Sequence, residues 1–367
     1  MNILFVGGRW DDFGGKESGY CTKLFSHLVV QCKGAAQTFF NGGYWKSIAE
    51  MQDKMNPRQY DVVLWFADIP NDKPKLVEEI KNRSPYSILV TSKNNIEEKY
   101  SLHLLVARAL KVKSNLVVEF KKRNGLYVAT ILDPLGNVFL NEESDIYNVA
   151  RVLAERIKEL KEFTRIPSIR IGDAIAAPDQ PEFFDLARKY ATVFHDLIHA
   201  DTTRFLGNIS FRCEHGFPSF RGDQLIFVSK RNVDKREISA ASFVAVSGKE
   251  LSCVHYFGDE KPSVDAPIQV RIYANFPKIR YMLHSHTYLE GAAMTAKMVP
   301  CGAIEELGQI MNAVPLGHLS RTSAVKCFRV NLRGHGSLVA SDKVSDFVNL
   351  PYIARPMPEF QNGDSSC

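Results

Sequence analysis

The sequence has no run of about eighteen apolar residues, so we expect no membrane-spanning helix. Its first residues, Met1-Asn-Ile-Leu-Phe-Val-Gly-Gly, lack the basic start and the small-residue cleavage site of a signal peptide, and we interpret them as a first buried strand. The seven cysteines are an odd number, and none forms a C-x-x-C pair. This argues against a disulfide framework or a cysteine zinc knuckle, and a reducing cytoplasm is the expected location.

The sequence also lacks a long lysine- or arginine-rich stretch. The net charge of +5 is spread over mixed signs, so we expect no nucleic-acid partner and no membrane partner. The hydrophobic fraction of 45% and the charged fraction of 24% are those of an ordinary globular protein. A chain of 367 residues is long enough for two domains, each with its own core.

Short apolar runs alternate with helical patterns through the first half of the chain. The predicted strands are 3–6, 61–66, 87–90, 116–120 and 126–132, the last two forming a hairpin around an Asn-Gly turn. The predicted helices are 20–30, 75–83, 102–111 and 145–163. This alternation predicts an α/β domain over residues 1–165, doubly wound in the Rossmann or flavodoxin manner. The proline-containing stretch 166–180 is predicted to be a linker.

A glycine-rich loop, residues 7–19, follows the first predicted strand. Backbone N–H groups beside a helix N-terminus can bind a phosphate, and the candidate residues for this are Gly14, Gly15, Lys16 and Ser18. The loop is neither G-x-G-x-x-G nor a Walker motif, and a loop at this edge of an α/β sheet is expected in any case. Binding of an anion or nucleotide and a purely structural loop therefore both stay open.

Three histidines in the second half of the chain form a pattern typical of a metal site. His284 and His286 are two residues apart, so in a strand both face the same side, and His335 stands between glycines that permit a sharp turn. Neutral imidazoles suit zinc, and three protein ligands leave a coordination position for a substrate. Taken singly, each histidine is an ordinary polar residue; together they predict a site for zinc or another divalent transition metal.

A second histidine pair has ligand spacing as well. His195 and His199 are four residues apart on a helix predicted from 181 to 200. No H-E-x-x-H glutamate accompanies them, so we interpret them as ordinary surface or core histidines.

The order of motifs over about residues 181–350 resembles the class II aldolase/adducin family. The matching pieces are Gly207-Asn-Ile-Ser-Phe-Arg212, Lys261-Pro-Ser-Val-Asp265, His284-Ser-His286 and His335-Gly336. The resemblance implies an α/β/α domain of the class II aldolase type, followed by a tail over 351–367. It also implies a zinc ion bound by the three histidines and a homotetramer with sites between subunits. The resemblance does not extend to the N-terminal domain.

The resemblance implies retro-aldol cleavage or epimerisation of a sugar-like, phosphorylated or nucleotide-linked substrate. Zinc polarises the substrate carbonyl and stabilises an enediolate, while an acid/base residue moves a proton. Asp265 stands at the family's carboxylate position, as in the pentose-phosphate 4-epimerase branch, although its place before Ala266-Pro267 also fits a simple helix cap. Glu305 and Glu306 lie where the epimerases bring a second carboxylate, or are exposed charges. Tyr352 resembles the tyrosine that such enzymes send into a neighbouring subunit.

The family usually carries a T-P-S-G or K-P-S-G turn that binds substrate phosphate. Here the corresponding stretch is Ser229-Lys230-Arg231-Asn232. The remaining candidates for binding an anion are Asn208, Ser210, Ser229, Lys230, Arg231 and Ser263. The altered turn favours a substrate other than the usual small phosphoketose.

Two other functions stay open at this point. The same scaffold supports metal-assisted dehydration of a sugar phosphate. A non-catalytic, adducin-like oligomerisation or interaction protein with a nucleotide-binding N-terminal domain is the other alternative. Such a protein has no need of a complete histidine triad, so the triad favours an enzyme.

Overall fold

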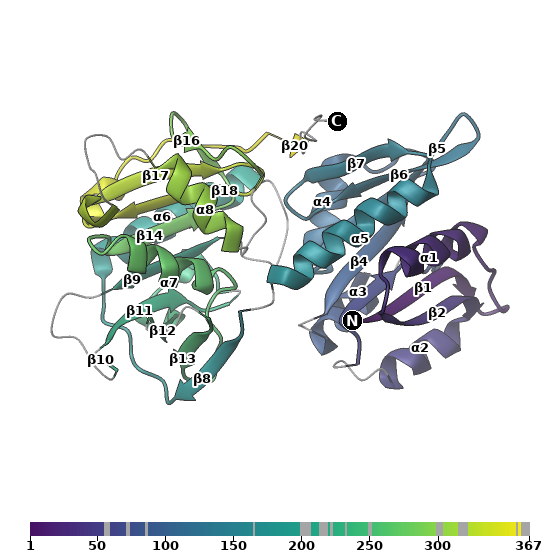
Figure 1. Ribbon diagram of the computed structural model, residues 1–367, viewed down its shortest axis with the longest axis horizontal. Helices are drawn as coiled ribbons and strands as arrows, with labels where there is room; N and C mark the ends of the chain where they lie inside the picture. Colours follow the sequence, from purple (N-terminus) through teal and green to yellow (C-terminus); the bar gives the residue numbers. More distant parts are fainter. Residues whose placement is uncertain are drawn as a thin grey trace. The chain divides into compact units, whose positions relative to one another are not determined.

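The structure of the chain is a computed structural model (Figure 1). It describes residues 1–54, 59–70, 74–84, 87–163, 166–198, 207–212, 219–220, 223–231, 233–248, 252–298, 304–314, 322–356 and 359–360. Contacts divide the chain into two compact units. The first contains Met1–Lys161 and the C-terminal strand, and the second contains Glu162–Ala200 and Phe205–Pro356.

The first unit is a mixed sheet with helices between its strands. The strands are β1 (Asn2–Asp11), β2 (Ala36–Tyr44), β3 (Val62–Trp65), β4 (Ile88–Asn94), β5 (Leu116–Arg123), β6 (Leu126–Leu132), β7 (Asn137–Glu143) and β20 (Glu359–Phe360). The helices are α1 (Gly19–Gln31), α2 (Trp45–Lys54), α3 (Pro74–Arg83), α4 (Leu102–Lys111) and α5 (Ile146–Phe163). The strand order is β2-β1-β3-β4-β5-β6-β7-β20, parallel from β2 to β5 and antiparallel through β6 and β7. The parallel part has the flavodoxin-like order.

Apolar strands of this sheet bury side chains on both faces. On one face Phe5 packs with Leu24 of α1 and Leu153 of α5. On the other face Trp65 packs with Ile48 of α2. Figure 1 shows α5 running across the strands of its face. Helices on both faces confirm the predicted doubly wound α/β class.

The beginning of this unit differs from the prediction. β1 continues past Gly7 and Gly8 to Asp11, where the sequence predicted a loop, and β2 and α2 were not predicted at all. β2 is the edge strand, and its residues are only half-buried or exposed. An edge strand of this kind needs no apolar run, so the hydrophobic pattern did not reveal it.

The second unit is built on a mostly antiparallel sheet. Its strands are β8 (Ser168–Gly172), β9 (Asn208–Arg212), β10 (Ser219–Phe220), β11 (Asp223–Ser229), β12 (Phe243–Ser247), β13 (Val254–Phe257), β14 (Tyr281–Ser285), β15 (Tyr288–Leu289), β16 (Ala293–Met294), β17 (Cys327–Leu332), β18 (Gly336–Ser341) and β19 (Tyr352–Ile353). Its helices are α6 (Pro181–Ile198), α7 (Ala266–Asn275), α8 (Ile304–Ala313) and the 3-10 turns η1 (Lys235–Glu237), η2 (Ala240–Ser242), η3 (Thr322–Ala324) and η4 (Val344–Phe347). The main sheet has the order β16-β17-β18-β14-β9-β11-β12-β13-β8.

Helices cover both faces of this sheet, in agreement with the predicted α/β/α arrangement. α7 and α8 pack on the face that contains Ile226 and Met282, and Figure 1 shows these two helices lying across it. α6 packs on the opposite face, which contains Phe227 and Leu283. Side chains alternate along β14, so His284 shares the side of Met282 and faces the layer of α7 and α8.

The predicted linker and tail both contain strands. Ser168–Gly172 forms β8, which pairs in parallel with β13 at the edge of the second sheet, so the linker prediction for 166–180 is wrong over these residues. The predicted tail, 351–367, contains β19, which pairs with β15, and β20, which pairs with β7. Short edge strands pair through only a few residues. The prolines beside these strands made the segments look like loops in the sequence. No helix of the described residues is long and apolar enough to cross a membrane.

Candidate metal centre

The three predicted histidines meet at one end of β14. Their ligand atoms all lie within 4.8 Å of one another, and the ring centroids of His284 and His335 are 4.6 Å apart. His284 is the penultimate residue of β14, and His286 follows directly after the strand. His335 lies in the tight turn between β17 and β18, two strands that continue the same sheet. The histidines of the strand and the histidine of the turn therefore come together, as predicted.

Two glycines allow the backbone to approach β14 closely enough for this meeting. A Cβ at Gly336 would lie 1.9 Å from the carbonyl oxygen of Ser285. A Cβ at Gly207, where φ is +81°, would lie 2.5 Å from the carbonyl oxygen of His284. No side chain fits at either position, so glycine is required both beside His335 and at the turn that precedes Asn208.

Burial and hydrogen bonding prepare the histidines as neutral ligands. Nδ1 of His284 lies 2.9 Å from the carbonyl oxygen of Ser337. A carbonyl only accepts, so Nδ1 carries the proton and Nε2 keeps its lone pair. Burial lowers the pKa of His284, and it holds the pKa of His335 well below its ordinary value. Both imidazoles are therefore neutral at pH 7, which is the state that binds a metal ion.

The donor set fits a divalent transition metal. Nε2 of His284 and both ring nitrogens of His335 are buried and have no hydrogen-bond partner among the described residues. Buried polar nitrogens without a partner are costly in a protein interior, and a bound cation would give a partner to one ring nitrogen of each histidine. Imidazole ligands suit zinc and its neighbours in the first transition series. We infer that His284, His286 and His335 would hold the ion.

Asp265 stands at the start of α7 but does not cap it. Its side chain makes no capping hydrogen bond, although Pro267 occupies the first turn as expected. Instead the buried carboxylate accepts a hydrogen bond of 2.6 Å from Nδ2 of Asn208. Asn208 is the register partner of His284, and the Asp265 carboxylate raises the pKa of that histidine against the effect of burial. The simple capping interpretation is therefore wrong, and Asp265 belongs to the surroundings of His284.

Glu306 lies beside His335, another of the three histidines. It is 4% exposed, and its Oε1 is 3.8 Å from Nδ1 of His335. The interpretation of this residue as an exposed charge is therefore wrong. Glu305 belongs to the same helix, α8, but its side chain lies outside the described residues.

The predicted anion-binding residues fall into two groups. Asn208, Ser210, Ser229 and Ser263 are buried. All four use their side chains within the fold. Asn208 also accepts from Gln269, and Ser210 Oγ lies 3.1 Å from the hydroxyl of Tyr273. Ser229 Oγ accepts from the amide of Ile209, and Ser263 Oγ accepts from the amide of Asp265. Lys230 pairs with Glu260, and Arg231 is exposed. Asn232 lies outside the described residues.

Tyr352 packs within its own chain. Its ring lies 5.1 Å from that of Tyr190 and 4.6 Å from that of Phe194, both on α6. Burial raises the pKa of its phenol well above the ordinary value. This packing gives the ring a structural role and does not support its extension into another subunit.

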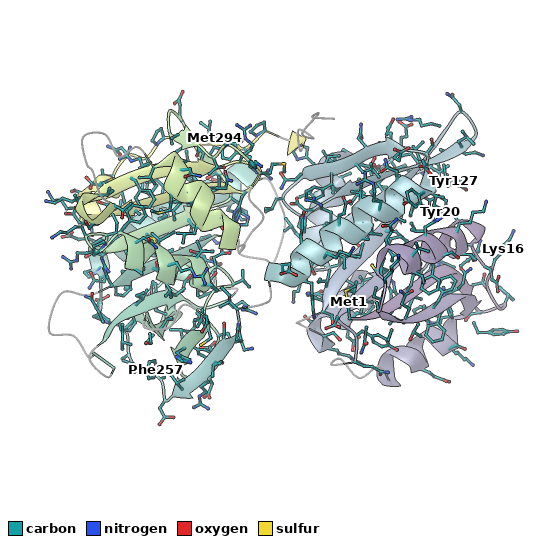
Figure 2. All side chains as sticks on the ribbon, viewed as in Figure 1. Met1, Lys16, Tyr20, Tyr127, Phe257 and Met294 are labelled. Carbon is teal, nitrogen blue, oxygen red and sulfur yellow. The ribbon has the colours of Figure 1, made fainter. Side chains whose placement is uncertain are left out.

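The glycine-rich loop of the first unit forms a hairpin that uses several of its own amides. Arg9 and Lys16 exchange backbone hydrogen bonds, and the amide of Gly15 donates to the side chain of Asp11. Ser18 caps α1: its hydroxyl accepts from the amide of Cys21. Gly14 has a φ of +104° at the tip, and Lys16 is exposed (Figure 2). These amides are engaged within the chain, and anion binding here stays a prediction.

Two basic residues near the triad were missed. Lys235, in η1, is 8% exposed, and its charge lowers the pKa of His284. Arg355 donates a hydrogen bond to the carbonyl oxygen of Gly334, and its charge lowers the pKa of His335. In the sequence, Lys235 stands among other charged residues and Arg355 stands near the last printed residues. Neither was therefore predicted as a site residue. Of the second histidine pair, His195 has a side chain 48% exposed, as expected, and His199 lies outside the described residues.

Known proteins resemble parts of this chain. Residues 188–354 match the model of the Class II Aldolase and Adducin N-terminal domain family. Methylthioribulose-1-phosphate dehydratase of Picosynechococcus sp. is 42% identical over 65 residues, which are 18% of this chain and 30% of that protein. The chain thus matches less than a third of the length of that curated relative.

Two solved structures show weak overall likeness. A DNA/pantothenate metabolism flavoprotein from Streptococcus pneumoniae covers 44% of this chain and 99% of its own, with 12% identity and a TM-score of 0.34. An aldolase II superfamily protein from Pseudomonas syringae covers 45% of this chain and 68% of its own, with 16% identity and a TM-score of 0.30. At these TM-scores neither likeness supports a conclusion about function.

Proposed function

Residues 188–354 form a class II aldolase-like domain, and on this premise we propose that the chain is a metal-dependent lyase acting on a sugar-like, phosphorylated compound. The observation that carries the proposal is the buried meeting of His284, His286 and His335. When bound, a divalent metal would supply Lewis-acid polarisation of a substrate carbonyl. The reaction also needs proton transfers, and side chains of this protein would carry them out.

We assign those proton transfers to two buried carboxylates. Glu306 lies beside His335, and Asp265 lies in the surroundings of His284. An acid/base group must come within hydrogen-bond reach of the proton that it moves. A substrate bound at the triad would have one carboxylate near each of two different histidines, so one can remove a proton and the other can return one.

The similarity to a dehydratase supports elimination of water as the reaction. In this elimination, a base takes the proton from the carbon next to the carbonyl, the carbon–oxygen bond of the neighbouring hydroxyl breaks, and the oxygen leaves as water after receiving a proton. The resulting enol tautomerises to a ketone. Proton removal and proton donation both require an acid/base group, and Glu306 and Asp265 meet that need.

Carbon–carbon cleavage or epimerisation is the second candidate, supported by the family model. Here the proton is removed from a hydroxyl oxygen, and a carbon–carbon bond breaks in place of a carbon–oxygen bond. The released aldehyde either departs or is added again on its other face. The same two carboxylates can serve this reaction.

The test is to incubate the zinc-loaded full chain with methylthioribulose 1-phosphate and identify the products by mass spectrometry. A product lighter by one water supports the dehydratase, and release of an aldehyde supports cleavage. His284→Ala should abolish turnover, whereas His195→Ala, which removes an exposed histidine of the same unit, should not. If a metal-loaded chain turns over neither this compound nor a panel of sugar phosphates, the lyase proposal fails and a non-catalytic role takes its place.

A further inference from the structure

We propose that Tyr288 is a positioning residue of the metal centre. Its hydroxyl holds the turn that carries His335 against the segment that follows His286. This role rests on the proposed function, because it concerns the metal-binding residues on which the lyase depends.

Strand pairing stops before it reaches two of the three histidines. The ladder between β14 and β18 ends at Ser285, one residue before His286. The ladder between β17 and β18 closes at Leu332 and Gly336, and His335 lies in the turn between them. Because strand pairing alone does not set the position of His286 relative to His335, other contacts have to do so.

The hydroxyl of Tyr288 makes one such contact. Tyr288 belongs to β15, follows His286 by two residues and is 4% exposed. The amide of Gly334 donates to its hydroxyl oxygen at 2.9 Å. Gly334 directly precedes His335 and has a φ of +70°, in the left-handed region that favours glycine. One hydrogen bond thus joins the chain just after His286 to the chain just before His335.

The phenol can serve as this link because β15 is itself fixed. The side chain of Asn331, in β17, accepts from the amide of Leu289 and donates to the Leu289 carbonyl oxygen, both at 2.8 Å. Asn331 is 4% exposed, so both bonds lie in the interior. β15 also pairs with β19, where Tyr288 is the register partner of Ile353. The Tyr288 hydroxyl is therefore a fixed point for Gly334.

Arg355 binds the other polar group of Gly334. Its Nη1 donates to the Gly334 carbonyl oxygen at 3.2 Å, while Tyr288 accepts from the amide of the same residue. A metal ion needs its three imidazoles at fixed positions, and a turn that is held in advance loses less freedom when the ion binds. Loss of the Tyr288 hydroxyl should therefore weaken metal binding, and not only the fold.

The test measures the zinc affinity of the full chain by competition with a chromophoric chelator. Tyr288→Phe keeps the ring and removes only the hydroxyl. It should weaken zinc binding about 10-fold, the lower end of what groups outside the ligand set contribute at metal sites.

Tyr190→Phe is the matched control. Tyr190 is 3% exposed, and its hydroxyl donates to the carbonyl oxygen of Phe347 and accepts from the amide of Leu350, on the α6 face of the sheet. Removing this hydroxyl also costs buried hydrogen bonds, so the variant should lose stability in urea unfolding. It should nevertheless bind zinc like the wild type.

The cobalt-loaded protein gives a second measurement. The visible absorption of bound cobalt depends on the geometry of its ligands, so Tyr288→Phe should alter the spectrum and Tyr190→Phe should not. Arg355→Met removes the other bond to Gly334 and should weaken zinc binding in the same direction. It replaces Tyr288→Phe in both measurements if the latter folds poorly.

The outcomes separate this role from the proposed function. Weaker zinc binding in Tyr288→Phe, with no turnover of any sugar phosphate by the wild type, upholds the role of Tyr288 while the lyase fails. Equal zinc affinity and equal cobalt spectra in the wild type and Tyr288→Phe refute the role, and turnover by both leaves the lyase standing. Equal losses of affinity in Tyr288→Phe and Tyr190→Phe also refute it, because zinc affinity would then only follow stability. If the wild type binds no zinc, the metal centre and this role both fail.

Discussion

At the scale of single residues, the chemistry depends on which ring nitrogens can bind a metal ion and which carboxylate oxygens can move a proton. The carbonyl of Ser337 fixes the proton of His284 on Nδ1, so Nε2 keeps the lone pair that a metal ion would bind. Glu306 is near His335 Nδ1, but at 3.8 Å it is beyond ordinary hydrogen-bond length. We therefore interpret Glu306 as a proton carrier rather than as a group that orients the histidine.

Glu306→Gln should lower kcat about 100- to 10,000-fold while the metal content stays the same. The reason is that the amide keeps the shape of the side chain but cannot take a proton. The measurement combines steady-state kinetics on the substrate found by screening with metal analysis of the same sample. Glu290→Gln, which changes an exposed glutamate of the same unit, is the control. Unchanged kcat in Glu306→Gln would remove this residue from the mechanism.

The histidines could be predicted from the sequence because the rule involved is local. Side chains two residues apart in a strand lie on the same face of the sheet, and a histidine between two glycines is typical of a tight turn. The place of Glu306 could not be derived in this way, because it depends on how α8 docks against the sheet. Lys235 was missed for a related reason: between Asp234 and Arg236 it looks like one more solvated charge, and only the fold turns it inward.

At the scale of elements, α7 is anchored to the sheet near both of its ends. Asp265 stands at its start and bonds to Asn208 of β9. At its end, Arg212, also of β9, donates to the carbonyl oxygens of Tyr273, Phe276 and Pro277. Arg212 therefore binds carbonyl groups that the end of a helix otherwise leaves without partners.

Arg212→Met should lower the free energy of unfolding of the second unit by about 1–3 kcal/mol, because carbonyl groups at the end of α7 lose a charged donor. The measurement is urea unfolding followed by far-UV circular dichroism. Arg170→Met should cost at most about 1 kcal/mol, since Arg170 is about half exposed and its ion pairs lie at the surface. Equal effects of the two substitutions would contradict the anchoring role.

Elements with strong periodicity were predicted, and edge strands were not. The amphipathic pattern of 145–163 matches α5, and the Asn-Gly turn matches the hairpin of β5 and β6. β2 and β8 are edge strands whose residues are mostly polar or half-buried, so hydrophobic alternation says little about them. Their existence follows from pairing with neighbours that lie far away in the sequence.

At the scale of the whole molecule, the two units have separate hydrophobic cores. Ile3 and Val118 belong to a core of the first unit, and Ile226 and Met282 to a core of the second. All three tryptophans, Trp10, Trp45 and Trp65, lie in the first unit. Tryptophan fluorescence therefore reports on the first unit, whereas the three-histidine cluster lies in the second.

Chelation of the metal should lower the Tm of the second unit by several degrees and leave the tryptophan-monitored transition nearly unchanged. A metal that binds only the folded state stabilises the unit that holds it. Calorimetry with and without EDTA measures the first effect, and fluorescence in the same samples measures the second. If both transitions shift together, the units unfold as one cooperative body and this account of separate cores is wrong.

The most direct test of a metal centre in this protein is the metal content per chain of the purified, untagged protein, measured by inductively coupled plasma mass spectrometry. We expect about one zinc, manganese, cobalt or iron per chain, as for a single three-histidine centre. That metal should be lost in His284→Ala and in His335→Ala and retained in His195→Ala. No bound metal after reconstitution at neutral pH, or full occupancy in His284→Ala, would contradict the existence of the centre.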